Sequence, residues 1–382
     1  MKEKALQIHE YGKISIQPTV KLDNAYDLSL AYTPGVAFPC QEIAKNPDLV
    51  YKYTSVGHMV LIISDGSAVL GLGNIGAKAA IPVMEGKALL LKKFAGLDAF
   101  PLCLDTQDAE EIIKIVKAVA CNCGGIILED ISAPRCIEIE RRLQEELNIP
   151  VFHDDQHGTA IVVAAALINA ARLLKKNLNE MRIVVSGTGA AGSAVIKIIK
   201  SLGVKEINAY NRSGVIDKSK YQEYGVVERE LLDDGYILTP QNHDNTLASI
   251  VAGSDAFIGV SAPNLLKKED IARMNENPIV FALANPIPEI LPEEAKAGGA
   301  KVIGTGRSDY PNQINNVLAF PGIFKGALSA KIPQISIDMK IAAAKAIAYL
   351  IKDEELTSDY LIPSVFDERV VEVVSQAIIK LG

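Results

Sequence analysis

A glycine-rich turn between a predicted strand and a predicted helix constrains the fold more than any other feature of the chain. Residues 182–186 (RIVVS) are typical of a buried strand, GTGAAG follows at 187–192, and an apolar helix is predicted over 191–202. In this order, the turn lets the backbone approach a pyrophosphate that sits on the helix N-terminus. The pattern predicts a Rossmann-type dinucleotide site formed by Gly187, Thr188, Gly189, Ala190, Ala191 and Gly192.

A second GxGxxG sequence, at 71–76, lacks this setting. Pro82 follows shortly after it, and no acidic residue closes a following strand at the usual distance. We interpret it as a structural or substrate-side turn.

The residue that ends the next strand bears on the choice of cofactor. A strand is predicted over 206–211, and Asn211 stands where an Asp or Glu would bind the ribose of NAD and repel the 2′-phosphate of NADP. Asn211 tolerates either cofactor, and the neighbouring Arg212 could pair with a phosphate. We therefore predict NAD or NADP, with a slight preference for NAD because only one cation is nearby.

Strand and helix patterns alternate along most of the 382 residues, which is typical of an α/β protein. We predict a first α/β domain over 1–157 and a dinucleotide domain over 158–382, joined by a long helix over 158–174. Helices within 320–382 are expected to pack back on the first domain. The other predicted strands cover 60–64, 100–104, 125–129, 151–153, 256–260, 279–282 and 301–304, and the other helices 78–94, 108–120, 136–147, 338–351 and 363–381.

Two pairs of carboxylates follow predicted strands. Glu129-Asp130 ends the strand at 125–129, and Asp154-Asp155 follows the strand at 151–153. Parallel strands bind ligands at their carboxyl ends, and four acids gathered there need a compensating cation. Oxygen ligands suit Mg²⁺ or Mn²⁺, and side chains that alternate along an extended strand would give Asp154 and Asp155 different roles. Adjacent acids are equally often helix caps or solvent-facing residues, so the pattern leaves both interpretations open.

Lys87 and Tyr32 indicate a function only when they are considered together with the other candidate site residues. Lys87 lies on the otherwise apolar face of the predicted helix 78–94, where burial could lower its pKa and make it a base. A solvated lysine is the commoner case. Tyr32 lies on a turn fixed by Pro34-Gly35, and alone it is only a turn tyrosine.

Composition excludes several classes of protein. With 46 acidic and 39 basic residues the net charge is −7, and no basic patch points to nucleic acid. The longest apolar runs, such as 160–171, are too short for a membrane span, and no signal peptide opens the chain. Five cysteines are few and odd in number, so we expect a reduced, cytoplasmic protein.

Eight segments together resemble the short prokaryotic form of the malic enzyme family along nearly the whole chain. They are AYTPGVA (31–37), SDGSAVLGLGNIG (64–76), PVMEGKALLLKKFAGLDAFP (82–101), LEDISAP (128–134), VFHDDQHGTA (151–160), SGTGAAG (186–192), ALANP (282–286) and NQINNVLAFPG (312–322). The resemblance implies oxidative decarboxylation of L-malate to pyruvate and CO₂ with NAD(P)⁺ and Mg²⁺ or Mn²⁺. It also implies a substrate- and metal-binding first domain, and a homodimer or higher homo-oligomer with the N-terminal segment at the interface.

The resemblance implies roles for single residues. Those that match the metal ligands are Glu129, Asp130 and Asp155. Lys87 matches the general base, which touches the substrate, and Asp154 matches its carboxylate partner. Tyr32 matches the general acid that protonates the enol.

The resemblance also involves three asparagines, and it fails at one position, Ala68. Asn285 and Asn316 match residues that contact cofactor or substrate, and Asn315 lies beside the latter. Ala68 stands where larger family members carry an arginine for a substrate carboxylate, so that partner is unassigned.

Three alternatives remain open from the sequence. A malolactic enzyme on the same scaffold would release lactate and retain its nicotinamide. A metal-independent amino-acid dehydrogenase also places a lysine before a nucleotide domain. A non-catalytic dinucleotide sensor could have kept the fold, although Tyr32, Lys87 and the four acids argue against it.

Overall fold

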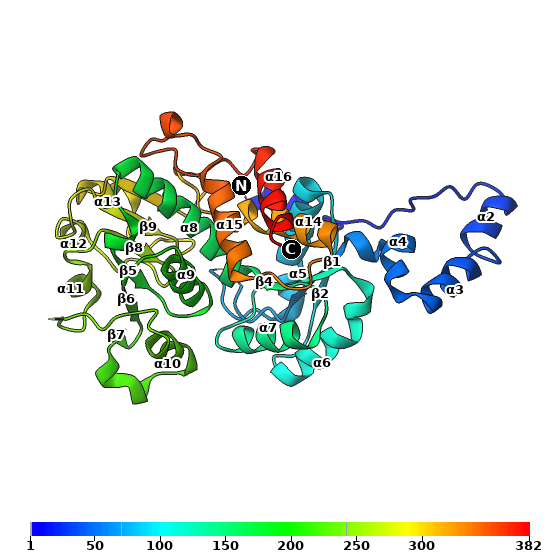
Figure 1. Cartoon of the computed structure of the whole chain (residues 1–382), viewed down its shortest axis with the longest axis horizontal. Coiled ribbons are helices and arrows are strands. Elements are labelled where there is room, and N and C mark those ends of the chain that lie inside the picture. The colour runs from blue at the N-terminus through cyan, green and yellow to red at the C-terminus, as the bar shows by residue number, and fades with distance from the viewer. Residues whose placement is uncertain (1, 70, 242) are drawn as a thin grey trace.

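The computed structural model describes residues 2–69, 71–241 and 243–382, and it contains two sheets that lie side by side (Figure 1). The first sheet has four parallel strands in the order β2-β1-β3-β4. Their bounds are Met59–Ser64 (β1), Asp98–Cys103 (β2), Gly125–Leu128 (β3) and Val151–His153 (β4). This arrangement confirms the predicted α/β class.

The second sheet has the strand order β10-β9-β8-β5-β6-β7. The strands are Arg182–Ser186 (β5), Glu206–Asn211 (β6), Gly214–Val215 (β7), Ala256–Gly259 (β8), Ile279–Ala282 (β9) and Val302–Thr305 (β10). All pairs are parallel except β6 with β7. A mostly parallel sheet headed by the glycine-rich turn is the predicted Rossmann-type domain.

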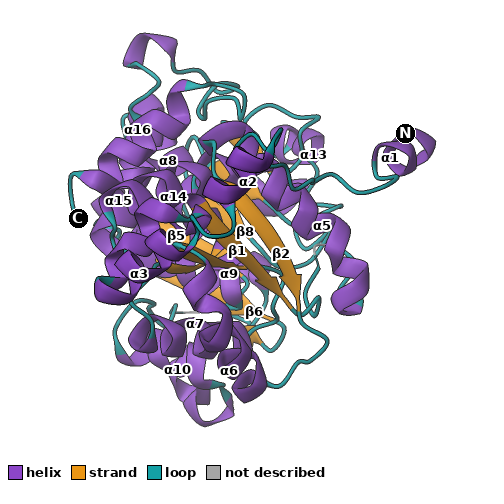
Figure 2. Cartoon of the chain, turned by 90° about the vertical axis from the view of Figure 1, so that its right-hand side faces the viewer, coloured by secondary structure: helices purple, strands orange, loops and turns teal. Residues whose placement is uncertain are grey.

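Helices cover both sheets (Figure 2). In the first half they are Gly76–Leu90 (α5), continued by a π-helical turn at Leu91–Ala95, then Ala109–Val119 (α6), Arg135–Glu146 (α7) and Asp154–Leu174 (α8). In the second half they are Ala190–Ser201 (α9), Val226–Asp233 (α10), Leu247–Val251 (α11), Lys268–Ile271 (α12), Pro292–Ala297 (α13), Phe320–Ala330 (α14), Ile337–Ala348 (α15) and Arg369–Ile379 (α16).

Helix α8 begins four residues earlier than predicted, so Asp154 and Asp155 form its first turn and do not extend the strand. Acidic residues stabilise the positive end of a helix, and the His153 ring caps it by accepting from Gln156 N at 3.3 Å. The expected extended-strand alternation of the two aspartates is therefore wrong. At 21 residues α8 is long and apolar enough to cross a bilayer, unlike the runs counted from the sequence, but it is mostly buried as a core helix.

The C-terminal helices contact the first sheet. Phe324 of α14 packs edge-on against Phe152 of β4, with ring centroids 6.1 Å apart. The sequence pattern predicts helices within 320–382 but assigns none of them to α14, which carries Pro321 and two glycines. Gly322 lets α16 approach, since a Cβ there would lie 2.6 Å from the Val374 side chain. Pro321 stands in the first turn of α14, where proline is tolerated.

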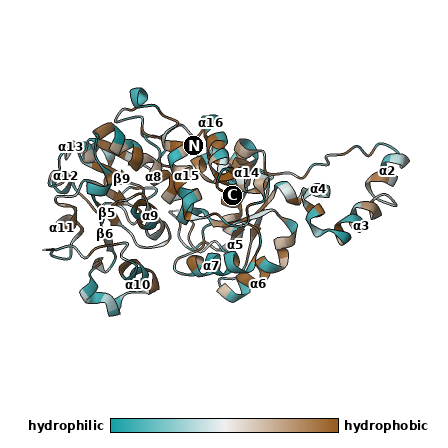
Figure 3. Ribbon diagram, viewed as in Figure 1, coloured by the Kyte–Doolittle hydropathy of each residue, from teal (hydrophilic) through white to brown (hydrophobic). Residues whose placement is uncertain are grey.

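An N-terminal arm stands away from both sheets (Figure 1). It comprises Ala25–Ala31 (α2), Ala37–Lys45 (α3) and Val50–Tyr53 (α4), whereas Lys2–Ile8 (α1) precedes it. None of these helices has a buried residue, although several residues of the arm are hydrophobic (Figure 3). Leu28, Leu30 and Phe38 are among those exposed.

Candidate active site

Two neighbouring strands deliver acidic residues to one edge of the first sheet. Leu128 of β3 pairs with His153 of β4, so Glu129 and Asp154 follow the two strands side by side. Both carboxylates are buried. The two acidic pairs therefore follow neighbouring strands at one edge of the sheet.

Lys87 lies between these two carboxylates. Its Nζ is 2.6 Å from Asp154 Oδ2 and 2.8 Å from Glu129 Oε1, and it stands 4.3 Å from the centroid of the Phe320 ring. Asn316 donates to the same Asp154 Oδ2 at 2.5 Å. The structure thus gathers Lys87, Glu129, Asp154 and Asn316 into one buried cluster.

Burial and neighbouring charges have opposing effects on the pKa values of Lys87 and Glu129. Burial alone would lower the pKa of Lys87, but the charges and hydrogen bonds of Asp154 and Glu129 outweigh it and raise that pKa. Burial also raises the pKa of Glu129, against the attraction of Lys87 and with the repulsion of Asp155. The predicted lowering of the Lys87 pKa is therefore wrong for this state, in which Lys87 is held protonated.

The other two carboxylates lie beside the cluster. Asp130 N donates to Asp155 Oδ2 at 2.8 Å, with Asp130 in the left-handed backbone region at φ 55°. His153 Nε2 lies 3.7 Å from the same oxygen of Asp155. One oxygen of Glu129, Oε2, is buried and has no hydrogen-bond partner among the described residues.

The carboxylates predicted as metal ligands are chemically suited to a hard divalent cation. Glu129, Asp130 and Asp155 offer only oxygen, and a cation would offset the repulsion that raises the pKa of Glu129. Across the described parts of the chain, however, no three Asp, Glu, His or Cys side chains are already gathered as a metal cluster. The three ligands predicted for a metal stay a prediction.

Glu140 of α7 is a buried residue that no sequence motif indicates. Its Oε1 accepts from His153 N at 2.7 Å, and its Oε2 accepts from Gln156 Nε2 at 3.1 Å and lies 2.9 Å from His157 Nε2. Burial would raise the pKa of Glu140, but His157 and other nearby cations lower it to about 2. This anion fastens the turn that carries Asp154 and Asp155.

The remaining asparagines separate into different roles. Asn315 Oδ1 accepts from Val317 N at 3.0 Å and so caps a short helical turn rather than joining the cluster. Asn285 precedes Pro286 after β9, and a Cβ on Gly71 would lie 3.1 Å from Pro286 Cδ. The 71–76 turn therefore abuts the 285–286 loop of the second domain.

The predicted dinucleotide turn has the expected local geometry. Gly187 has φ 106°, and a Cβ on Gly192 would lie 1.8 Å from the Gly187 oxygen, so neither position accepts a side chain. A Cβ on Gly189 would meet nothing within 4 Å, which leaves the space in front of α9 open. Ala190 and Ala191 begin that helix, whose N-terminus suits a pyrophosphate.

The ribose end of this turn carries polar side chains. Asn211 Nδ2 donates to Thr188 Oγ1 at 3.3 Å. Arg212 is exposed beside it. The structure therefore brings Asn211 to the glycine-rich turn.

Tyr32 is not brought to the cluster. It follows α2 on the N-terminal arm and is 66% exposed. Within residues 2–69, 71–241 and 243–382, its hydroxyl makes no hydrogen bond.

One cation lies near Ala68. Arg135 Nη2 donates to Asp65 Oδ2 at 2.6 Å and to Ser67 Oγ at 2.9 Å. Through these two contacts with Asp65 and Ser67, Arg135 braces the loop that carries Ala68.

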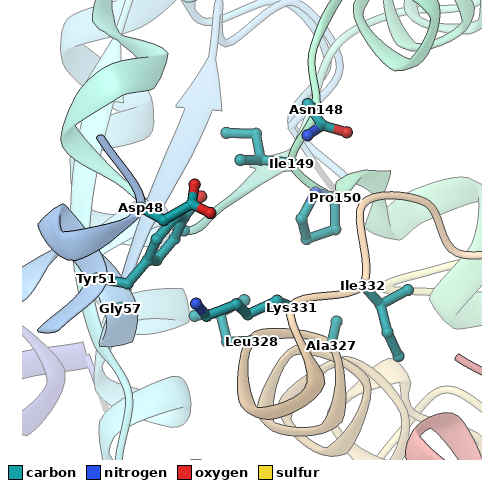
Figure 4. Close-up of a pocket in the computed structure, with 11 residues that line it drawn as sticks. Asp48, Tyr51, Gly57, Asn148, Ile149, Pro150, Ala327, Leu328, Lys331 and Ile332 are labelled. Carbon is teal, nitrogen blue, oxygen red and sulfur yellow. The ribbon is translucent and has the colours of Figure 1, made fainter. Parts of the chain in front are cut away.

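A cavity of about 230 Å³ lies elsewhere (Figure 4). Gly124 and Pro150, which precede β3 and β4, line it together with Tyr51 and Lys331. It opens at the amino ends of these strands, opposite the carboxylate cluster, and is no part of that site.

A buried lysine–carboxylate centre in one α/β domain and a glycine-rich turn in a second define the class as a nicotinamide-dependent oxidoreductase. Family profiles agree with this class. The malic enzyme N-terminal domain matches residues 11–144, and the malic enzyme NAD binding domain matches residues 156–381. The chain belongs to the malic enzyme family.

Individual relatives match along almost the whole chain. An NAD-dependent malic enzyme of Geobacillus stearothermophilus is 52% identical over 99% of this chain and 78% of its own length. A bifunctional malic/malolactic enzyme of Bacillus subtilis is 49% identical over 100% of this chain and 92% of its own. The crystal structure of an NAD-dependent malic enzyme from Thermotoga maritima has a TM-score of 0.93 and 47% identity, covering 98% of both chains. The predicted resemblance is confirmed, and these matches favour a malic enzyme over an amino-acid dehydrogenase or a non-catalytic sensor.

Proposed function

We propose that this chain oxidatively decarboxylates L-malate to pyruvate and CO₂ with NAD(P)⁺ as acceptor. The observation that carries the proposal is the placement of Lys87 between Asp154 and Glu129 at the carboxyl edge of the first sheet. Family membership supplies the substrate class. The lysine and the carboxylates supply the groups that this reaction needs.

Lys87 and Asp154 act as a pair on the substrate hydroxyl. Lys87 first passes its proton to Asp154, whose pKa burial raises and whose Oδ2 it contacts at 2.6 Å. Neutral Lys87 then takes the proton of the malate C2 hydroxyl. Asn316 steadies the acceptor oxygen of Asp154 by donating to it.

Glu129, Asp130 and Asp155 would hold a divalent cation, Mg²⁺ or Mn²⁺. When bound, the cation polarises the substrate oxygens, and the nicotinamide takes up the hydride of C2. The support is the oxygen-only donor set and the buried Oε2 of Glu129, for which the described part of the chain offers no hydrogen-bond partner. A positive charge beside Glu129 also reduces the attraction that keeps Lys87 protonated.

Tyr32 is proposed to protonate C3 of the enol from a second copy of the chain. The arm that carries Tyr32 stands off the molecule with its apolar side chains exposed, and the same chain does not bring Tyr32 to Lys87 (Figure 1). A homodimer that covers these side chains would both bury them and complete the site. With all five cysteines free, we also propose a cytoplasmic protein.

Product analysis tests the proposed reaction. Purified protein given L-malate, NAD⁺ and Mn²⁺ is expected to form NADH and pyruvate in equal amounts. Lactate without net NADH would instead identify a malolactic enzyme and contradict the proposal.

A further inference from the structure

An acidic group does stand at the end of β6, although Asn211 is the strand's last residue. Glu228, the third residue of α10, places Oε1 at 2.7 Å from Thr188 Oγ1 and 3.3 Å from Asn211 Nδ2. Both donors belong to the predicted dinucleotide site. Glu228 is separated from Asn211 by 17 positions along the chain, so the strand pattern could not reveal it.

We propose that Glu228 selects NAD over NADP. In dinucleotide domains, a carboxylate at the end of the second strand accepts hydrogen bonds from the ribose hydroxyls and repels a 2′-phosphate. Here the carboxylate reaches the same place from α10 and is steadied there by Asn211. The inference rests on the proposed function, since it presumes that a nicotinamide dinucleotide binds at 187–192.

The opposing charges nearby do not cancel Glu228. Arg229, its neighbour, donates to the Gln222 carbonyl at 3.0 Å and stands over the Tyr221 ring, so its guanidinium is engaged by the segment before α10. Arg212 is exposed and, among the described residues, forms no ion pair with Glu228. The carboxylate therefore faces the ribose end with its charge uncompensated, which is unfavourable for a 2′-phosphate.

Fluorescence titration of NADH and NADPH tests this without turnover. The chain has no tryptophan, so the nicotinamide emission can be followed without interference from it. Wild-type protein is expected to bind NADH more tightly than NADPH, and Glu228→Gln is expected to tighten NADPH roughly tenfold while changing NADH little. Glu228→Asp keeps the charge and should retain the preference for NADH over NADPH. It provides a second test if the Gln variant fails to fold.

A matched control lies on the same helix. Glu230 bonds Arg141 at 2.6 Å and Lys197 at 2.5 Å, away from Thr188, so Glu230→Gln should leave the NADH/NADPH ratio unchanged. An unchanged ratio in folded Glu228→Gln, or equal wild-type affinities, would overturn the inference and leave the function standing. Failure of the wild type to bind either nucleotide would instead overturn the proposed function.

Discussion

Lys87 Nζ lies 2.6 Å from Asp154 Oδ2, although 67 residues separate them in the chain. With Glu129 on its other side, Lys87 is held by two buried carboxylates, and their charges raise its pKa despite its burial. In the proposed mechanism the pair exchanges a proton, and a cation bound beside Glu129 would make the lysine a base. This proposal couples acid–base chemistry to cation binding through one contact.

Removal of divalent cations should stop the reaction and loosen the fold. With EDTA, malate-dependent NADH formation is expected to fall to background, because Glu129 then keeps Lys87 protonated. Excess Mn²⁺ should restore the rate and raise Tm by a few degrees, since a ligand that binds only the folded state stabilises it. The measurement is a chelation and add-back series with parallel melting curves. A full rate in EDTA would rule out the cation.

The sequence predicted those parts of the fold that depend on local pattern. RIVVS followed by GTGAAG predicted β5 and α9 correctly, because a buried strand, a glycine turn and an apolar helix are read from adjacent residues. Helix α14 was not predicted, because its glycines are explained only by the approach of α16. The predicted start of α8 is four residues late. The apolar pattern begins only after the acidic first turn, so it does not reveal that turn as helical.

Contacts between distant segments could not be read in the same way. Glu140 looked like one of several charges on α7, and Glu228 like an ordinary charge on α10, until the fold placed them beside His153 and Asn211. Tyr32 was assigned from a motif alone, and the fold left it on the arm. Sequence motifs identify the candidate site residues, but only the tertiary structure shows which of them are in contact.

A mixing experiment tests whether Tyr32 works in a partner's site. Tyr32→Phe and Lys87→Ala should each be inactive alone. If the two residues come from different copies, an equal mixture that exchanges subunits has one intact site in each mixed dimer and should regain about a quarter of wild-type activity. The rate is measured after refolding or long incubation of the mixture. No regain in a mixture shown to contain mixed dimers would place both residues in one copy.

Glu140 should matter for catalysis beyond its effect on stability. In Glu140→Gln one of the two acceptor oxygens becomes an amide NH₂, which removes the acceptor either for His153 N or for Gln156 and His157. The turn that carries Asp154 and Asp155 should shift, lowering kcat roughly tenfold or more and weakening Mn²⁺ binding, as followed by electron paramagnetic resonance.

Asn169 of α8, the helix that begins at Asp154, provides the control for Glu140. Its amide donates to the Ala348 and Leu361 carbonyls at 2.9 and 2.8 Å, far along α8 from Asp154. Asn169→Leu should lower Tm but leave Mn²⁺ affinity near wild type. If both variants lost the same Mn²⁺ affinity, Glu140 would contribute only to stability, and its positioning role would be contradicted.

Lys340 should make stability depend on pH. Burial lowers the pKa of this α15 lysine to about 8, against the attraction of Glu140. Between about pH 8 and the unfolded value near 10.4, the unfolded chain binds more protons, so the free energy of unfolding should rise with pH. Lys340→Met should be more stable than wild type at pH 7 by up to about 3 kcal/mol, a gain that fades above pH 10. Urea unfolding at pH 7 and pH 10 measures it, and a variant less stable at pH 7 would contradict the assignment.

The rate of malate-dependent NADH formation by Lys87→Ala tests the central claim most directly. At saturating NAD⁺ and Mn²⁺, we predict a fall in kcat of about a thousandfold, with NADH still bound at wild-type affinity, because a positioned base is lost while the nucleotide domain is untouched. Lys93→Ala, an exposed lysine in the turn that follows α5, should keep the wild-type rate. An undiminished rate in Lys87→Ala would contradict the assignment of this lysine and the mechanism built on it.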